Sequence, residues 1–287
     1  MPVFNSEKFL KESIDSILVQ SFDNYRLLIL NDGSTDLSKE IIMSYNDNRI
    51  NYYENDKNLG YSRALNYLIS LSNRKYIARM DADDISFQDR LKHQLHFLEN
   101  NPEIFLCGTW FKIFGDTEKT IKYPINHSEI KVMLLSTCCI AHPSVMFRNQ
   151  RGVEYNVDFE PAEDYNLWNN LCKSKLLANL PEVLLHYRSH DNQVSNQRFL
   201  EQRDNANKTR LDVFHDFYPD ATHSEKELFL SLMTCYVNKD LLYDRLIVKQ
   251  FCNKIIQINY NNRYFDNYIF EKYVNNWLSN LVNKYGI

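Results

Sequence analysis

The sequence predicts an α/β fold in which a mostly parallel central sheet is flanked by helices, followed by a C-terminal helical extension. Three observations predict it. Short apolar runs alternate with segments of helical periodicity through the first hundred residues. Strands that alternate with helices form parallel sheets covered on both faces. From residue 196 onward the pattern is helical, and that part contains only one Pro and one Gly.

Each expected element has its own signal. Strands show as compact apolar runs, and helices show as apolar side chains spaced three and four residues apart. Residues 101–190 combine strands with short helices, and Glu163 opens one of the helical patterns. In chain order we expect helices at 9–18, 37–45, 60–71 and 88–98, and strands at 25–30, 50–53, 75–80, 104–109, 144–148 and 183–187.

The composition excludes some classes of protein. Charged residues make up 24% and hydrophobic residues 44% of the 287, which is ordinary for a folded globular chain. The net charge of −4, without a strongly basic block, argues against a nucleic-acid partner. The sequence has neither a run of 18 apolar residues nor a signal peptide. We therefore expect a cytoplasmic protein, and peripheral contact with the inner face of the membrane stays open.

Polar clusters directly follow two of the expected strands. Asn31 to Asp36 follow the strand at 25–30, and Asp81, Asp83 and Asp84 follow the strand at 75–80. Parallel sheets bind their ligands beyond the carboxyl ends of the strands, where the strand order reverses. Two clusters at one edge of a sheet therefore predict a ligand site there.

The three aspartates predict a metal site. Asp81 and Asp83 are two residues apart, so an extended backbone directs both side chains to the same side. Crowded carboxylates repel one another unless a cation lies between them. A solvated turn in which Asp84 caps the following helix explains one carboxylate but not three. Ligands that are all oxygen favour Mg²⁺ or Mn²⁺.

Two other turns can be explained with or without a ligand. Asp32 could accept a hydrogen bond from a nucleobase or a ribose hydroxyl. The turn from Asn58 to Arg63 could present backbone N–H groups and the Arg63 guanidinium to a nucleotide. Both segments also satisfy the pattern of an ordinary turn that caps a helix.

Three further segments are candidates for catalysis, and each has an ordinary structural explanation as well. Acidic residues are favoured in the first turn of a helix, which accounts for Glu163 and Asp164, but a rigid helix start would also hold Asp164 as a general base. His190 could contact a metal or a diphosphate, with Arg188 adding positive charge near a leaving group. A lone histidine such as His142 is more often structural than catalytic.

Taken in order, these motifs resemble glycosyltransferase family 2, which uses nucleotide sugars and has the GT-A fold. In two respects the sequence departs from the family. Gln88 stands where the family has a proline, and the apolar strand that the family has ahead of its opening segment has no counterpart, so we expect the first strand to be truncated and a sheet edge to be exposed. The matching segments are Met1–Asn5, Gln20–Phe22, Leu30–Asp36, Asn58–Asn66, Met80–Leu91, His142–Arg148, Glu163–Trp168 and Tyr187–His190.

The resemblance implies a role for each candidate residue. The opening segment would stack an aromatic ring, here Phe4, on the base, and Asp32 would bind that base. Asp83 would hold Mn²⁺ or Mg²⁺, and Asp164 would deprotonate the acceptor. The remaining residues are expected around these four: Pro2, Arg63 and Asp81 at the nucleotide, His190 at the metal and diphosphate, and His142, Glu163 and Arg188 near the donor and acceptor.

The resemblance covers residues 1–195, which we expect to form the catalytic domain, with 196–287 as the helical extension. It implies an inverting glycosyltransferase that moves a sugar from a nucleotide-diphosphate donor, with UDP favoured, to a hydroxyl of a saccharide or lipid-linked saccharide in cell-surface polysaccharide or glycolipid assembly. The alternative is a non-catalytic nucleotide-binding or scaffold module derived from the same fold. The aromatic-rich extension offers a surface for a homodimer or for a membrane.

Overall fold

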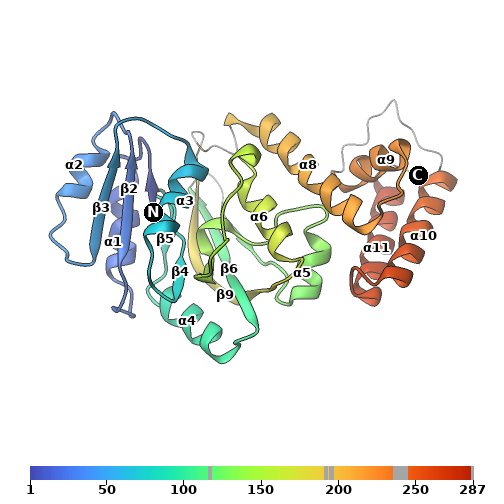
Figure 1. Ribbon diagram of the computed structural model, residues 1–287, viewed down its shortest axis with the longest axis horizontal. Coiled ribbons are helices and arrows are strands. Elements are labelled where there is room, and N and C mark those ends of the chain that lie inside the picture. The colour runs from blue at the N-terminus through green and yellow to red at the C-terminus, as the bar shows by residue number, and fades with distance from the viewer. Residues whose placement is uncertain (116–117, 191–192, 194–196, 235–244, 286–287) are drawn as a thin grey trace.

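The computed structural model describes residues 1–285 except 116–117, 191–192, 194–196 and 235–244, with side chains described up to residue 279. The molecule is elongated: a small N-terminal sheet lies at one end, a larger sheet in the middle and a group of helices at the other end (Figure 1). Ser195, at the expected end of the catalytic domain, lies outside the described residues.

The N-terminal sheet is entirely parallel and has the order β1-β2-β3. Apolar side chains of its first helix and central strand pack together, and Leu10, Ile14 and Ile29 are completely buried. The expected alternation is confirmed in this part of the chain. Its elements are β1 (Pro2–Val3), α1 (Leu10–Leu18), β2 (Leu27–Asp32), α2 (Ser38–Met43), β3 (Ile50–Asn55) and α3 (Tyr61–Leu71).

The larger sheet has the order β4-β8-β6-β9-β5, with β7 paired to β6. Within it only β6 and β9 run parallel, and the other described pairs are antiparallel. The α/β class is thus confirmed, while the parallel pairing is concentrated in the N-terminal sheet. The elements are β4 (Tyr76–Ala78), β5 (Ile85–Ser86), α4 (Arg90–Asn100), β6 (Ile104–Gly115), β7 (Lys119–Ile121), α5 (His127–Met133), β8 (Met146–Arg148), α6 (Glu163–Leu171) and β9 (Leu176–Ser189).

An apolar groove separates the two sheets. In the described structure β2 pairs with β3 on one side and with the two-residue β1 on the other, and β4 pairs only with β8. A cavity of about 630 Å³ lies between them, lined among others by Leu28 and Ile77. The Met1 amino group lies at its end and donates a hydrogen bond to the Leu28 carbonyl oxygen at 2.8 Å. β1 has two residues, and it pairs with Leu30 and Asn31 of β2.

The C-terminal helices form their own apolar core. Stacked and tilted rings fill its centre, with the rings of Phe214 and Phe229 parallel at 4.1 Å between centroids. Val132 and Leu135, from α5 and the loop after it, belong to the same cluster, so the helices are packed against the larger sheet's flank. The helices are α8 (Phe199–Phe217), α9 (His223–Met233), α10 (Arg245–Asn262) and α11 (Asn267–Tyr285).

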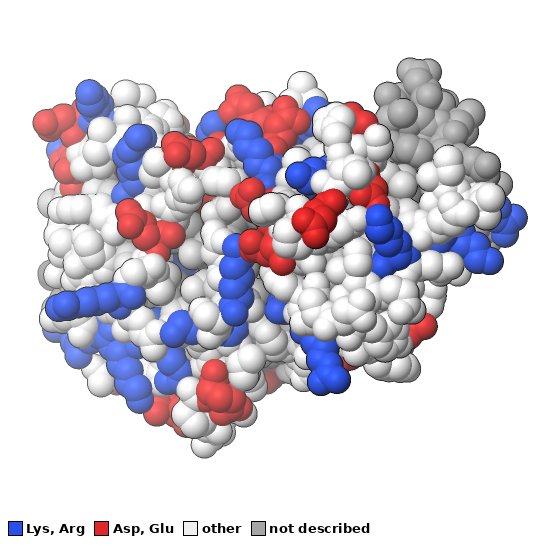
Figure 2. All heavy atoms as spheres, turned by 45° about the vertical axis from the view of Figure 1, so that its right-hand side comes forward, with Lys and Arg blue, Asp and Glu red and all other residues white. Residues whose placement is uncertain are grey.

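Two surface properties bear on partners. On the face shown in Figure 2, Lys and Arg side chains are interspersed with Asp and Glu, and no basic stripe stands out. Among the described residues, none of the helices combines the length and the apolar character that crossing a bilayer requires.

Candidate active site

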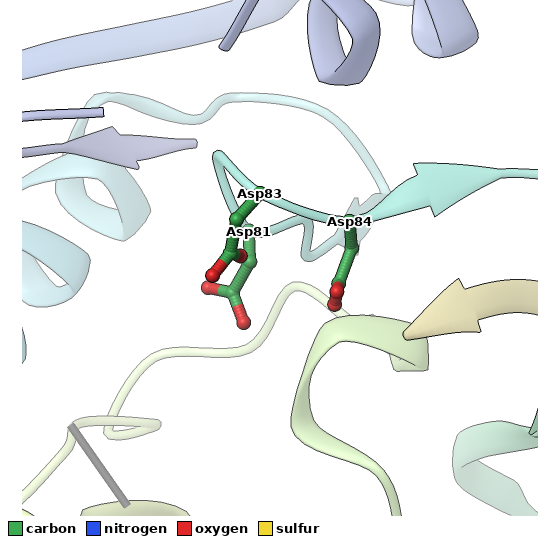
Figure 3. A group of neighbouring side chains, drawn as sticks. All are labelled: Asp81, Asp83 and Asp84. Atoms are coloured by element: carbon green, nitrogen blue, oxygen red, sulfur yellow. The ribbon is translucent and has the colours of Figure 1, made fainter. Parts of the chain in front are cut away.

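The three aspartates lie together where β4 leads into β5. Each offers a carboxylate oxygen, and these oxygens lie within 4.8 Å of one another. In Figure 3 the carboxylates of Asp81 and Asp83 lie close together, and that of Asp84 points to the same side from further along the segment. The predicted acidic cluster is therefore present as a compact group of oxygen ligands.

Asp81 is held by two other side chains. Arg79 approaches both of its oxygens, one of them with Nη1 at 2.6 Å, and the Tyr61 hydroxyl donates to it at 2.7 Å. Arg79 is only 6% exposed, so its charge is strongly felt by the carboxylates around it. Sequence reasoning missed Arg79, although a cation inside an otherwise apolar run was the available signal. Asp81 thus has its charge balanced within the protein.

Asp83 is paired with His190 across the site. Their Oδ2 and Nε2 atoms are 3.0 Å apart, although the residues are 107 positions apart in the chain. Burial raises the pKa of the Asp83 carboxyl, with a further contribution from Asp81, and His190 and Arg79 oppose this rise. The structure therefore brings together the two residues that were expected to bind a metal.

Asp84 and Arg188 stabilise the loop itself. Asp84 is completely buried, and burial, reinforced by Asp83 and Asp81, raises its pKa well above its usual range. The backbone N–H of Arg188 donates to its Oδ1 at 2.9 Å, and its Oδ2 has no hydrogen-bond partner in the described structure. The Arg188 guanidinium donates to the Asp83 carbonyl oxygen and to Glu12. Arg188 consequently holds β9 against the acidic loop.

These residues fit a divalent cation. Carboxylate oxygens and an imidazole nitrogen suit Mn²⁺ or Mg²⁺, and the buried Oδ2 of Asp84 is a polar atom without a hydrogen-bond partner in the described structure. Because Asp81 is already paired with Arg79, Asp83 and His190 are the residues best placed to hold the ion.

The part of the site that was predicted to bind the nucleotide is formed by the turns at the ends of β2 and β3. Asp32 is only 3% exposed, and its carboxylate accepts hydrogen bonds from the backbone N–H groups of Leu59 and Gly60 and from the Asn55 side chain. Gly33 has a φ of 72°, and a Cβ there would lie 2.5 Å from the Lys57 carbonyl carbon. Asp32 therefore fixes the turn before α3, and its role in binding a nucleobase stays a prediction.

Phe4 and Arg63 frame the same region. The Phe4 ring is 47% exposed, as a ring that stacks on a ligand must be, and Pro2 lies in β1 beside the groove. Arg63 donates to the Leu59 carbonyl oxygen at 3.1 Å. Glu160, which sequence reasoning missed, accepts a hydrogen bond from the backbone N–H of Ser62 at 2.8 Å and so caps α3.

Asp164 lies at the start of α6, as predicted. Its Oδ1 accepts a hydrogen bond from its neighbour Tyr165 at 2.6 Å, and its Oδ2 lies 3.6 Å from the Cys138 Sγ. Burial raises the pKa of the Asp164 carboxyl, whereas the Tyr165 N–H, Arg79 and Cys138 oppose the rise. A carboxylate whose pKa is moved toward neutrality suits a general base.

Glu163 and His142 lie beside Asp164 but are buried. Burial, then the Asp164 charge, raises the pKa of Glu163 to about 8. Burial also lowers the pKa of His142 well below its usual value, so the imidazole is neutral. His142 Nε2 is 2.8 Å from the Tyr155 hydroxyl, and its ring lies edge-on to that of Trp168. His142 packs beneath the site, in agreement with the structural explanation of its sequence position.

Arg79 connects the two halves. Its charge opposes the rise in the pKa of Asp83 and of Asp164, so the acidic loop after β4 and the start of α6 are linked electrostatically. Of the predicted residues, Asp81, Asp83 and Asp84 form the acidic cluster, to which Arg188 and His190 are bonded. Glu163 and Asp164 lie at the start of α6 with His142 beside them, whereas Phe4, Asp32 and Arg63 lie in the neighbouring turns.

Comparison with known proteins identifies the class. The sequence profile described as Glycosyl transferase family 2 matches residues 1–157. An O-antigen biosynthesis glycosyltransferase of Escherichia coli, WbnJ, is 36% identical over 208 residues, which cover 67% of this chain and 78% of that protein. The chain belongs to glycosyltransferase family 2 and is a transferase with the GT-A fold.

Solved structures support the fold. S. aureus TarS in complex with UDP-GlcNAc superimposes with a TM-score of 0.61 at 16% identity, covering 90% of this chain and 79% of that one. The mannosyltransferase PcManGT from Pyrobaculum calidifontis, in complex with GDP-Man and Mn²⁺, gives 0.56 at 15% identity, covering 77% and 63%. At these identities the likeness concerns the fold alone.

Proposed function

We propose that this chain is an inverting glycosyltransferase that moves a sugar from a nucleotide-diphosphate donor, with UDP as the favoured nucleotide, to a hydroxyl of a saccharide or lipid-linked saccharide. The observation that carries the proposal is the acidic cluster after β4, in which Asp81 pairs with Arg79 and Asp83 with His190, together with the carboxylate of Asp164 at the start of α6, on which the Arg79 charge also acts. Two similarities support a nucleotide sugar as donor and a saccharide as acceptor. The structurally similar TarS was solved with UDP-GlcNAc, and the relative WbnJ is named for O-antigen biosynthesis.

On the donor side, Asp83 and His190 would hold Mn²⁺ or Mg²⁺. The bound ion would neutralise the charge that develops on the departing diphosphate. Phe4 would stack on the base from its exposed position, with Pro2 beside it, while Asp32 would shape the base pocket through the turn it fixes. Arg63 and Asp81 would line the nucleotide.

On the acceptor side, Asp164 would take the proton from the attacking hydroxyl. Burial raises its pKa, which makes this carboxylate a stronger base than an exposed one. In an inverting reaction the hydroxyl attacks the anomeric carbon from the face opposite the diphosphate, so the base and the metal ligands belong on opposite sides of the sugar. Glu163, His142 and Arg188 would support this arrangement through the contacts described above.

The proposal extends to the setting of the reaction. We place the catalytic domain at residues 1–195, the helical extension at 196–287 and the protein at the cytoplasmic face of the membrane. The exposed apolar side chains of α10 and α11, such as Ile247 and Tyr268, are candidates for contact with a membrane or a second copy. Vesicle flotation and sedimentation velocity separate these two contacts.

The test is a screen of nucleotide sugars for Mn²⁺-dependent release of the nucleotide. The wild-type chain should release UDP from at least one UDP-sugar, and Asp83→Ala should abolish Mn²⁺-dependent UDP binding in a calorimetric titration. Asp89→Asn provides a matched control, because Asp89 lies outside the cluster and contacts Ser21. Binding without any release would support the scaffold alternative, and unchanged UDP affinity in Asp83→Ala would remove Asp83 from the metal site.

A further inference from the structure

The C-terminal helices contact the segments on both sides of Asp164. Asn205 and Gln202 of α8 donate to the carbonyl oxygens of Glu160 and Pro161, just before α6. Thr209 accepts a hydrogen bond from the Asn166 side chain at 3.2 Å. The chain is therefore bonded to α8 both before Asp164, at residues 160 and 161, and after it, at Asn166.

The same helices fix the loop that follows α5. Arg210 of α8 donates to the Ser136 carbonyl oxygen at 2.6 Å, and its guanidinium lies over the Tyr165 ring, 5.2 Å from the centroid. The Ser136 hydroxyl lies 2.5 Å from the hydroxyl of Tyr273 on α11. Tyr165 itself donates to the Leu134 carbonyl oxygen. Three side chains, from α6, α8 and α11, thus set the position of this loop.

The loop after α5 places the thiol of Cys138 beside Asp164, the proposed general base. Cys138 lies two residues beyond Ser136, is partly exposed, and its Sγ is 3.6 Å from Asp164 Oδ2 and 3.4 Å from the Ile140 carbonyl oxygen. A thiol has one proton to donate. Burial and the Asp164 charge raise the pKa of Cys138 well above its usual value, so the thiol keeps that proton near neutral pH.

We infer that the helical extension positions the catalytic base: Arg210 holds the Ser136–Cys138 loop, and the Cys138 thiol is the second hydrogen-bond donor to Asp164. This inference rests on the proposed role of Asp164. Arg210 and Cys138 act through Asp164 and are positioning residues.

The other groups that face Asp164 do not replace this donor. The Tyr165 N–H occupies Oδ1, and Arg79 acts on the carboxylate through its charge while its guanidinium is bonded to Asp81. The neighbouring acids repel the Asp164 charge rather than stabilise it. The groups concerned are Asp81 and Glu163, with the Tyr123 and Tyr155 hydroxyls also within electrostatic reach.

The first experiment compares two arginines of the same helix. Arg210→Met should lower the rate of Mn²⁺-dependent UDP release from the best UDP-sugar by about ten- to a hundredfold, since a small displacement of a reacting group is costly, and should leave UDP affinity unchanged. Arg210→Lys should restore much of the rate, because an ammonium can still donate to the Ser136 carbonyl. Arg203→Met is the control, because Arg203 lies on the same helix and pairs with its neighbour Asp204.

The second experiment needs no turnover. The rate of Cys138 alkylation by iodoacetamide is followed by mass spectrometry, with the fragments distinguishing Cys138 from the buried Cys139. Asp164→Asn should raise this rate several-fold, because loss of the adjacent charge lowers the pKa of the thiol. Arg210→Met should raise it by loosening the loop. Glu163→Gln should leave it unchanged near neutral pH, because the pKa of Glu163 is about 8 and the substitution therefore removes little charge.

The outcomes separate this inference from the proposed function. If the wild-type chain turns over no nucleotide sugar, the proposed function fails, and the alkylation rates still decide whether the loop and thiol are placed as inferred. Equal alkylation rates in wild type and Asp164→Asn would mean that the thiol donates to Ile140 alone. Wild-type turnover in Arg210→Met would overturn the role of α8. If that variant does not fold, the alkylation rates of the wild type and of Asp164→Asn decide the inference.

Discussion

The Arg79 guanidinium lies buried beside five acidic side chains that would otherwise repel one another. It is bonded to Asp81, and its charge opposes the rise in the pKa of Asp83, Asp84, Glu163 and Asp164. A buried cation of this kind is costly to desolvate and is retained where its partners need it. At the scale of single residues, the ionisation of the site depends on this one side chain.

Replacing Asp164 with Asn tests the base. The amide keeps the shape of the side chain but cannot accept a proton, so turnover should fall by about 10²–10⁴, the usual worth of a general base. UDP affinity in the presence of Mn²⁺ should stay as in the wild type, because Asp164 lies on the acceptor side. Steady-state kinetics and calorimetry measure the two quantities, and full activity of Asp164→Asn would show that another group is the base.

Glu163 should make the stability of the protein fall as the pH rises. Its pKa is about 8 in the folded chain, against an ordinary value of 4.5, so the folded state binds the proton more tightly than the unfolded state. Stability from this group is therefore full below pH 4.5 and is lost as the pH rises toward 8. Glu163→Gln should flatten the decline of Tm between these limits, as measured by thermal melts. A parallel decline in both proteins would contradict the assignment.

At the scale of elements, the groove between β2 and β4 is the feature that sequence spacing could not define. In the described structure β4 pairs only with β8, β1 pairs with only two residues of β2, and apolar side chains such as Leu28 and Ile77 line the groove. Open edges beside apolar surface accept an added strand readily.

An apolar strand should stabilise the protein when it is joined ahead of Met1. A four-residue segment rich in Val and Ile would continue the parallel pairing of β1 with β2 and cover the groove. Tm should rise by several degrees, given about 2–4 °C for each kcal/mol in chains of this order. A Gly-Ser segment of the same length is the control, and equal Tm values for the two extensions would show that the groove does not accept a strand.

At the scale of the whole molecule, the helical extension and the sheets share one core. Val132 and Leu135 belong to the same apolar cluster as the C-terminal helices, and Lys131 donates to the Tyr264 carbonyl oxygen at 2.7 Å. The extension therefore covers surface that the sheets cannot bury alone, and it also reaches the loops around Asp164.

Removal of the extension should destabilise the remainder. A chain that ends at residue 198 would expose Val132 and Leu135 to water, at about 25 cal/mol for each Å² of apolar surface. We expect it to aggregate or to melt well below the full chain, as seen by size-exclusion chromatography and circular dichroism. A soluble fragment with the Tm of the full chain would instead make the extension an independent unit.

The sequence predicted the features that depend on local spacing. Alternating apolar runs define the strands and helices, and carboxylates directly after a strand lie at its carboxyl end, so the cluster of Asp81, Asp83 and Asp84 could be predicted from spacing. The role expected of Asp164 came from the family resemblance, because acidic residues are common at any helix start. Neither the arrangement of strands in the larger sheet nor the division into two sheets has such a local signal, because pairing depends on contacts between distant segments.

Only the tertiary structure decided which atoms meet. Arg188 and Asp84 are 104 residues apart, and Cys138 and Asp164 are 26 apart, so no spacing rule connects them. The structure also showed that the Asp32 carboxylate serves its own turn and that Asp81 is paired with Arg79. Residue type and local periodicity determine what chemistry a chain carries, whereas burial and long-range packing determine which of those groups remain available for a ligand.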